Sequence, residues 1–415
     1  MDNRYNINED GIGIISNGVI EIGESAFRGC TSLKNIDISN SVTKIGESAF
    51  QDCTTLENIV IPNSVTEIGR NAFRGCTSLK SIDIPNSVTK ISEFAFNGCT
   101  SLKDIVIPSS VIEIGGYAFW GTIWFNIRRN VMYINNVLYN SNSYYKYYGG
   151  SHLNVKEGTI SISDYAFKGC SSLRSIIIPN SVKKIGENAF QGCTSLESIV
   201  FPKSIAEIGG RTLAGCKSIR NIVVPNSVTE IGREAFRGCS SLENIVIPNS
   251  VTEIKHDAFS DCTSLKSIEI PNSVTEISYH TFSNCTSLEI IVIPNGVKKI
   301  GRWAFYGCTS LKSVEIPNSV TEISREAFAG CSSLDNIKIP NSVIRMGKYV
   351  FYDCFSLKTI HFMSIQVPPI DYGAFQGFNI DGCTLYVPSG TREMYKHHEL
   401  FGKFKNIEIE NNNGI

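Results

Sequence analysis

A phrase of 23 residues recurs along most of this 415-residue chain. Positions 62 to 82 are "PNSVTEIGRNAFRGCTSLKSI", and positions 225 to 245 are "PNSVTEIGREAFRGCSSLENI". One such segment is too short to bury its apolar side chains alone, so each copy must stack on its neighbours. The repetition therefore predicts a solenoid that grows by one layer per copy, and we call each layer a rung.

The spacing of apolar residues within one copy predicts its local structure. "LKSIDIP" alternates as a short strand does, and "VTEIG" is a second short extended segment. "GRNAFRGC" is expected to form a single helical turn that ends at the glycine. We therefore expect an α/β-type repeat solenoid of about fifteen rungs, with strands stacked in parallel about 4.8 Å apart. The apolar positions of one copy are Ile61, Val65, Ile68, Ala72, Phe73, Cys76, Leu79 and Ile82.

Thirteen of the fourteen cysteines follow the repeat, with Cys30, Cys53, Cys76 and Cys99 each 23 residues apart and nine more at the same interval from Cys170 to Cys354. A parallel ladder holds successive Cβ atoms about 4.8 Å apart with parallel bonds, whereas a disulfide needs about 3.8 Å and converging bonds. Thiolates from four rungs would span about 14 Å, too far for one zinc ion. We expect reduced, buried thiols that act as small apolar core groups.

Composition and termini narrow the classes of partner. The net charge of −1 gives no electrostatic reason to expect nucleic acid or an anionic membrane. No uninterrupted apolar stretch reaches the roughly 18 residues of a membrane span. The first residues, "MDNRYNINEDG", lack the basic and apolar regions of a secretory signal peptide. We expect a monomer that does not insert into a membrane.

The sequence contains no constellation typical of catalysis. His256 and His280 fall on adjacent rungs, but no carboxylate or cysteine partner for a metal site is evident beside them. There is no phosphate loop, dinucleotide fingerprint or HExxH motif. We therefore expect no catalytic residue, no cofactor and no bound metal. A rung-by-rung series of carboxylates predicts a solvated face rather than a catalytic pair, at Glu67, Glu230, Glu253, Glu276 and Glu322.

Charges alternate in sign at the position two residues before the first strand isoleucine. Neighbouring strands place these groups about 5 Å apart, where opposite charges help slightly and like charges destabilise. The alternation predicts a row of exposed ion pairs that stabilises the stack. The series is Arg174, Glu197, Arg220, Glu243, Lys266, Glu289, Lys312, Asp335 and Lys358.

The residue between the two inward isoleucines varies between rungs and is the place where a partner could be recognised. Four consecutive rungs carry Ile177, Val200, Val223 and Val246 there, and Val292 follows two rungs later. One interpretation is β-propensity, since branched residues suit strands. The other is a docking stripe for a protein ligand, 15 to 20 Å long at about 4.8 Å per strand.

The regular phrase is interrupted between Cys99 and Cys170 by atypical rungs at about residues 120–160. Trp120 and Tyr139 are expected to fill the core of a distorted rung. The tyrosines at positions 144 to 148 could be a recognition patch or filler, because consecutive residues cannot all point inward. These ligand-contact candidates are Tyr144, Tyr145, Tyr147 and Tyr148.

The period breaks again near the C-terminus, where Cys354 and Cys383 are 29 residues apart. We expect a solenoid at residues 1–362, followed by an irregular repeat and cap at residues 363–415. A helix starting near Ser389 is expected to lay Met394, Tyr395 and Phe401 over the last rung, because an exposed sheet end invites pairing with other chains.

Together, "IPNSVTEIG", "AFRGC" and "TSLKSI" at 23-residue spacing resemble the BspA-like class of leucine-rich repeats over about residues 12–362. "VMYINNVLYNSNSYYKYYGG" resembles the longer, tyrosine-rich repeat of that family, and "CTLYVPSGTREMYKHHELFGKFKNIEI" resembles its terminal segment. The resemblance implies a curved solenoid with a parallel sheet on the concave face.

Members of that family are mostly surface or secreted proteins of host-associated microbes, implicated in adhesion. The resemblance thus implies a non-catalytic protein that binds a host matrix or cell-surface protein through its concave face and aromatic interruption. A cytoplasmic scaffold or inhibitor that clasps a partner protein is the alternative, because neither a signal peptide nor an anchor is visible in the sequence. Buried, reduced thiols are compatible with either compartment.

Overall fold

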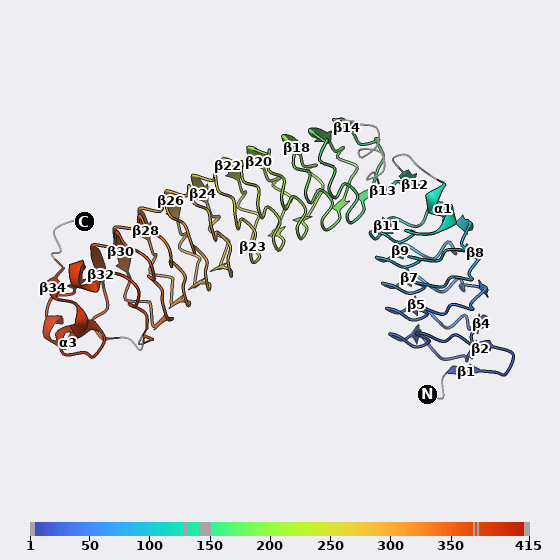
Figure 1. Cartoon of the computed structure of the whole chain (residues 1–415), viewed down its shortest axis with the longest axis horizontal. Helices are drawn as coiled ribbons and strands as arrows, with labels where there is room; N and C mark the ends of the chain where they lie inside the picture. Colours follow the sequence, from blue (N-terminus) through green and yellow to red (C-terminus); the bar gives the residue numbers. More distant parts are fainter. Residues whose placement is uncertain (1–4, 128–131, 141–150, 368–369, 372, 411–415) are drawn as a thin grey trace. The chain divides into compact units, whose positions relative to one another are not determined.

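The computed structural model describes residues 5–127, 132–140, 151–367, 370–371 and 373–410. These residues form a parallel-sheet solenoid of about 16 turns with very few helices, which confirms the predicted fold class (Figure 1). The chain divides into two compact units. Unit 1 comprises Met1–Gly150, Val155–Lys168 and Ser181–Ala189, and unit 2 comprises Ser151–Asn154, Gly169–Asn180 and Phe190–Ile415.

A regular rung contributes two short strands, as β7 (Glu67–Ile68) and β8 (Ser81–Asp83) illustrate. In β8 the side chain of Ile82 is buried while its neighbours on both sides are exposed, as the alternation of a strand requires. We call the strands at the repeat position of β8 the main sheet and those at the position of β7 the second sheet, and backbone pairing divides each series into shorter sheets, for example between β18 and β20. Each described strand of a regular rung pairs in parallel with its counterpart 23 residues away, for example Ile82 with Ile105.

The bounds of the described elements are as follows. The main sheet has β1 (Tyr5–Ile7), β2 (Ile12–Ile15), β4 (Asn35–Ile38), β6 (Asn58–Ile59), β8 and β10 (Asp104–Val106) in unit 1. In unit 2 it has β14 (His152–Asn154), β16 (Ser175–Ile177), β18 (Ser198–Val200), β20 (Asn221–Val223), β22 (Asn244–Val246), β24 (Ser267–Glu269), β26 (Ile290–Val292), β28 (Ser313–Glu315), β30 (Asn336–Ile339), β32 (Thr359–Phe362), β33 (Thr384–Val387) and β34 (Asn406–Ile409).

The second sheet has β3 (Glu21–Ile22), β5 (Lys44–Ile45), β7, β9 (Lys90–Ile91), β11 (Glu113–Ile114), β13 (Val137–Asn140), β15 (Ser161–Ile162) and β17 (Lys184–Ile185) in unit 1. In unit 2 it has β19 (Glu207–Ile208), β21 (Glu230–Ile231), β23 (Glu253–Ile254), β25 (Glu276–Ile277), β27 (Lys299–Ile300), β29 (Glu322–Ile323) and β31 (Arg345–Met346). The remaining elements are β12 (Met132–Ile134), α1 (Ile123–Asn126), η1 (Ile380–Gly382), α3 (Arg392–Lys396) and η2 (Phe401–Lys403).

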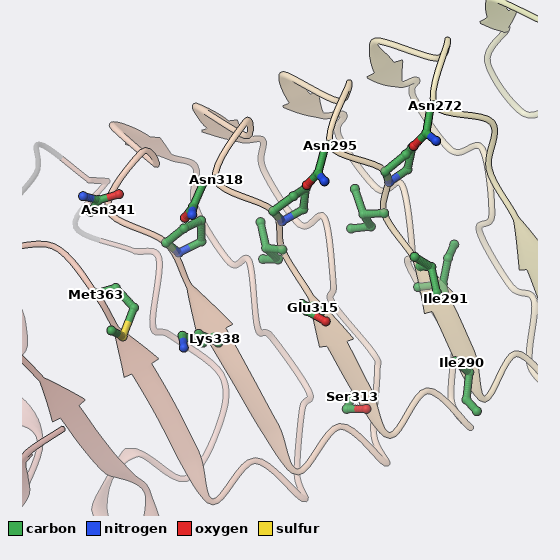
Figure 2. A pocket seen from close by; sticks show the side chains of 16 residues that line it. Asn272, Ile290, Ile291, Asn295, Ser313, Glu315, Asn318, Lys338, Asn341 and Met363 are labelled. Atoms are coloured by element: carbon green, nitrogen blue, oxygen red, sulfur yellow. The ribbon is translucent and has the colours of Figure 1, made fainter. Parts of the chain in front are cut away.

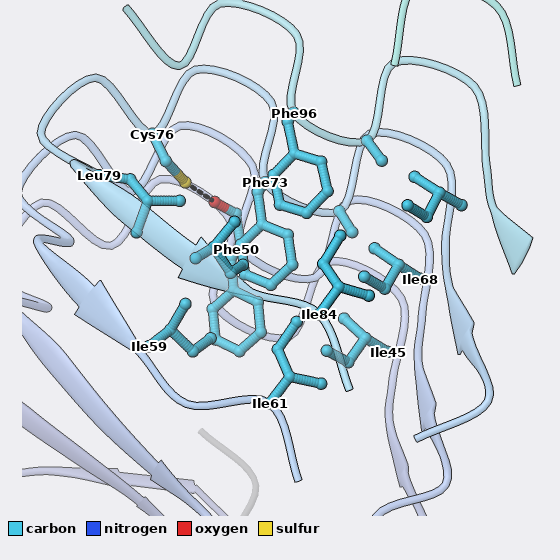
Figure 3. Packing of buried hydrophobic residues seen from close by; sticks show 14 of the residues in the cluster. Ile45, Phe50, Ile59, Ile61, Ile68, Phe73, Cys76, Leu79, Ile84 and Phe96 are labelled. Atoms are coloured by element: carbon cyan, nitrogen blue, oxygen red, sulfur yellow. Dashed lines mark hydrogen bonds between the residues drawn. The ribbon is translucent and has the colours of Figure 1, made fainter. Parts of the chain in front are cut away.

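The core is a set of parallel columns, each built from one position of the repeat. All eight apolar positions of the copy at residues 61–83 are buried, as predicted. The phenylalanine column stacks ring on ring, with centroids 5.2 Å apart between Phe50 and Phe73 and again between Phe73 and Phe96 (Figure 3). Offset stacking of this kind adds to the free energy of area burial alone.

The segment "GRNAFRGC" does not form the helical turn that its sequence predicts. Asn71 and Gly75 have positive φ angles, of 55° and 75°, which no α-helix accommodates. The backbone N–H of Phe73 donates to the carbonyl of Ala95 in the next rung, at 2.7 Å, while that of Ala72 closes a turn to Gly69. Backbone N–H groups of this segment thus bond alternately to carbonyls of the same rung and to carbonyls of the next rung.

The glycine of this segment is replaced by Asp or Asn in some rungs, and the backbone explains which replacements occur. Asp52, Asp261, Asn284 and Asp353 have φ angles near 60°. Asn and Asp tolerate the left-handed region better than other non-glycine residues. The substitution pattern therefore reflects a turn geometry rather than helix termination.

Cysteine thiols occupy a buried position in which they also donate hydrogen bonds. Cys76 Sγ donates to the carbonyl of Phe50 in the preceding rung, at 3.1 Å (Figure 3). The same bond recurs in unit 2, where Cys262 Sγ donates to the carbonyl of Phe236 at 3.2 Å. This position suits a small side chain that is apolar enough to be buried and still carries a weak donor.

The predicted ion-pair row forms in part on the exposed flank of the main sheet, where six of its nine residues close into three pairs. Arg174 pairs with Glu197 at 2.9 Å and Arg220 pairs with Glu243 at 3.1 Å. Lys312 pairs with Glu289 at 3.0 Å. These side chains are largely exposed, so each pair contributes little by itself.

We expect Glu243→Lys to lower the free energy of unfolding by roughly 0.2–1 kcal/mol, because it breaks the pair with Arg220 and places a cation between Arg220 and Lys266. Urea denaturation at low salt measures this loss. The loss should shrink in 1 M salt, where charges separated by more than about 3 Å are screened. A loss of the same size in high salt would contradict the electrostatic explanation, and Glu243→Gln is the matched control.

The irregular segments fill their core with aromatic rings. Tyr139 is buried, as predicted, and its hydroxyl accepts a hydrogen bond from the Phe119 backbone N–H at 2.8 Å. Trp120 is 49% exposed, so the prediction that it fills the core is wrong; Trp124 is buried there instead. In the last rungs of unit 2, Tyr395 and Phe401 are buried as predicted.

Met394 does not join them. Its side chain is 40% exposed on α3, so the expectation that it covers the last rung is wrong. Consecutive residues of a helix point in directions about 100° apart, so a short helix that buries Tyr395 turns Met394 away. The strands β33 and β34 continue the parallel main sheet beyond β32.

Candidate protein-binding surface

An apolar stripe crosses the outer face of the main sheet in unit 2. Ile177, Val200, Val223 and Val246 end the consecutive strands β16, β18, β20 and β22. They are 60%, 66%, 68% and 61% exposed, respectively. Ile177 is in register with Val200, and Val223 with Val246, so the exposed methyl groups lie side by side within each of these two pairs of strands.

The same position in unit 1 shows a different pattern. Val60 and Val106 are exposed there, but Asp37 and Asp83 occupy the alternate rungs. Isolated exposed apolar residues are normal on protein surfaces, whereas contiguous ones indicate an interaction site. Within the described residues, the run of four apolar rungs at this position occurs in unit 2.

The remaining candidates are distributed less evenly. Val292 is 62% exposed on β26, but Glu269 on β24 separates it from the stripe. Ile290, on the same strand as Val292, is 61% exposed and was not among the predicted contacts. The signal was present in the sequence, because most rungs carry Ser or Asn at the position of Ile290. Tyr144, Tyr145, Tyr147 and Tyr148 lie outside the described residues.

A groove of about 790 Å³ lies over the main sheet around β26, β28 and β30. Ile290, Val292, Glu315 and Lys338 line it from the strands, and Met363 follows β32. Asparagines of the Pro-Asn turns line one side of it, where the strands end (Figure 2). These are Asn272, Asn295, Asn318 and Asn341. The sequence alone did not indicate this groove, because its lining comes from residues one period apart.

The two histidines on adjacent rungs lie on either side of one carboxylate. His256 Nδ1 is 3.0 Å from an Asp257 oxygen, and His280 Nδ1 is 3.8 Å from the other oxygen. Burial lowers the pKa of His280, which favours the neutral ring. Across the described residues, no group of three or more His, Cys, Asp or Glu is arranged to hold a metal ion.

The carboxylates of the second sheet face solvent with basic neighbours. Glu67 pairs with Lys90 at 2.9 Å, and Glu276 with Lys299 at 3.7 Å. They stand on a sheet surface, and Lys90 and Lys299 occupy the same position in the neighbouring rungs. In the described part of the chain, no helix is both long and apolar enough to cross a membrane.

Solved structures of bacterial leucine-rich repeat proteins are similar to the chain. A leucine-rich repeat protein from Bacteroides ovatus is 28% identical, with 88% of this chain and 97% of that chain covered and a TM-score of 0.47. The leucine-rich repeat protein of T. pallidum is 31% identical, with 45% of this chain and 78% of that chain covered and a TM-score of 0.37. The pneumococcal vaccine antigen PcpA is 18% identical, with 98% of this chain and 96% of that chain covered and a TM-score of 0.44.

No curated protein matches the chain significantly. The family described as "BspA type Leucine rich repeat region" matches it in 6 copies, at residues 12–126, 139–266 and 252–381. These ranges span well over half of the sequence and include both units. The chain therefore belongs to the BspA-type leucine-rich repeat family.

Proposed function

We propose that this protein is a non-catalytic adhesion solenoid that binds a host matrix or cell-surface protein through the main sheet of unit 2. Its family is generally non-catalytic, and repeat proteins of this type are commonly used for protein interaction. The observation that carries the proposal is the run of Ile177, Val200, Val223 and Val246, each at least 60% exposed on adjoining rungs.

β-propensity explains why such residues suit a strand, but it does not require them on the solvent side of four rungs in succession. Polar residues occupy the corresponding position at Asp37, Asp83, Glu269 and Glu315 without interrupting the fold. A protein ligand that covers the stripe would remove this apolar area from water, which is the main favourable term in association. A location at the cell surface or outside the cell is part of the proposal and follows from the family.

Replacing Val200, Val223 and Val246 by Thr tests the stripe. Each change exchanges one methyl group for a hydroxyl, and about 0.8 kcal/mol per buried carbon predicts a loss near 50-fold when all three are covered. The measurement is the dissociation constant for purified host matrix proteins, determined one by one with the full chain. Circular dichroism should show an unchanged fold, since threonine also suits strands.

Val60→Thr with Val106→Thr is the matched control, because these exposed valines take the same place in rungs of unit 1. The control should leave the dissociation constant within about twofold. Unchanged binding by the triple variant would refute the placement of the site on the stripe.

A further inference from the structure

Asn295 and Gly296 form one of four Asn-Gly pairs in the sequence, of which Asn413–Gly414 lies outside the described residues. In such a pair the backbone nitrogen of the glycine can attack the side-chain amide carbon of the asparagine, because glycine has no Cβ to hinder the approach. The attack releases ammonia and closes a five-membered succinimide ring. Water then opens the ring and leaves an aspartate or an isoaspartate in place of the asparagine.

A β-turn that follows β26 leaves both reacting groups of Asn295 and Gly296 accessible. The Val297 N–H donates to the Pro294 carbonyl at 3.1 Å, which closes the turn without using either central N–H group. Asn295 is exposed on the wall of the groove (Figure 2). Among the described residues, neither the Gly296 N–H nor the Asn295 side-chain amide has a hydrogen-bond partner.

Closing the succinimide ring also requires the backbone of Asn295 to rotate, and little opposes this rotation. Over the described part of the chain, the backbone N–H and C=O of Asn295 make no hydrogen bond either. The bond from Val297 therefore holds the turn closed. A single hydrogen bond contributes little net stability, so the turn opens readily.

Two other Asn-Gly pairs are protected by hydrogen bonds from the glycine that would attack. In Asn97–Gly98 the glycine N–H donates to the Trp120 carbonyl of the next rung, at 2.8 Å. In Asn17–Gly18 the glycine N–H donates to Ser41 Oγ at 3.2 Å. Each glycine nitrogen must leave its partner before it can attack, so these two pairs should react slowly.

The turn of Asn295 recurs in the neighbouring rungs of the groove wall, with serine in place of Gly296. In each of them a valine N–H donates to the proline carbonyl, at 3.0 to 3.2 Å. The serine side chain hinders the attack that glycine permits. A Cβ added to Gly296 would lie 2.4 Å from the Asn272 carbonyl oxygen, so the turn at Asn295 is fitted to glycine. The asparagines that precede serine, which we call the wall asparagines, are Asn272, Asn318 and Asn341.

We infer that Asn295 is a site of spontaneous deamidation. The Gly296 nitrogen forms a bond to Asn295 Cγ, and its proton passes through solvent to Nδ2, which leaves as ammonia. Water then adds to one of the two ring carbonyl carbons bonded to that nitrogen. Cleavage of the new bond to Cγ gives aspartate, and cleavage of the original peptide bond gives isoaspartate.

The reaction changes the charge of the groove. Glu315 and Lys338 supply one negative and one positive charge to its lining, so the new carboxylate at position 295 makes the lining net negative. The inference concerns the chain alone and does not rest on the proposed function.

Incubation of the full chain at about pH 8 tests the inference, because the buried thiols still contribute their full stability there. Proteolysis followed by mass spectrometry measures the converted fraction of each asparagine over time. Asn295 should convert about tenfold faster than each of the wall asparagines, because its successor lacks a Cβ. It should also convert about tenfold faster than Asn17 and Asn97, whose glycine N–H groups are released only by local opening.

Gly296→Ser is the matched variant, because the neighbouring rungs carry serine in the same turn. It should slow conversion of Asn295 about tenfold. In urea, where the chain is unfolded, Asn17 and Asn97 should convert as fast as Asn295. The comparison with the wall asparagines uses the native chain, so it holds even where the variant fails to fold.

Three results would each overturn the inference. The first is conversion of Asn295 no faster than that of the wall asparagines. The second is equal conversion of Asn17, Asn97 and Asn295 in the folded chain. The third is an unchanged rate at Asn295 in a folded Gly296→Ser variant.

Discussion

Phe259→Ala should lower the free energy of unfolding by about 3–5 kcal/mol, the range for removing a fully buried phenylalanine. The Phe259 side chain has no exposed surface and stacks on Phe236 and Phe282, with centroids 5.3 and 5.6 Å away. Its loss leaves a cavity between two rungs and breaks a column that a solenoid cannot rebuild from elsewhere. Guanidinium denaturation followed by circular dichroism measures the change.

Phe259→Leu is a control that the chain itself supplies, because Leu213 occupies the equivalent position and is fully buried. A leucine refills most of the volume, so we expect a loss below about 1.5 kcal/mol. Equal losses for the alanine and leucine variants would show that the column does not depend on volume. An unchanged midpoint for the alanine variant would contradict the packing described here.

Alkaline pH should destabilise the protein steeply through its buried thiols. Burial raises the pKa of Cys239 from an ordinary value of 9.0 to about 12, and burial also raises the pKa of Cys262. Between about pH 9 and pH 12 the unfolded chain has lost these protons while the folded chain retains them. The free energy of unfolding therefore falls as pH rises, by about 1.4 kcal/mol per pH unit for each thiol. Below about pH 9 this contribution is fully present.

Cys239→Ala combined with Cys262→Ala should reduce that slope by about 2.7 kcal/mol per pH unit between pH 9.5 and 11. Urea denaturation at a series of pH values, with a reductant present, gives the slope. Loss of packing lowers the free energy of unfolding equally at every pH and leaves its slope against pH unchanged. The packing loss can therefore be distinguished from the titration of the thiols. Cys30→Ala is the control, because Cys30 is only half-buried and should change the slope less. An unaltered slope in the double variant would contradict the titration of buried thiols.

Much of the fold could be predicted from the repeat. The period located every buried column, because a solenoid places equivalent residues in equivalent environments. The alternating charges of Arg220, Glu243 and their neighbours predicted the ion pairs for the same reason. The segment around Phe73 was assigned the wrong conformation, since its apolar spacing fits a helical turn while its left-handed residues do not. The Gly, Asp and Asn series at Gly75 and its equivalents was the available signal.

The candidate surface could be predicted only in part. Alternation along each strand placed Val200, Val223 and Val246 on the outer face, where the structure has them. Trp120 was expected to be buried because size alone suggested a core filler, yet its neighbour Trp124 takes that place. The same alternation predicts an exposed Ile290, because this residue precedes the buried Ile291 on β26.

The sequence by itself determined which residues of each rung are buried and which are left to vary, because a 23-residue period repeats every local environment. Only the tertiary structure decided how the variable residues combine into surfaces. The groove depends on Val292, Glu315 and Lys338 lying in register on β26, β28 and β30, and on the asparagines of the Pro-Asn turns that line one side of it. Those relations exist only once residues one period apart lie in register, so no single copy of the repeat contains them.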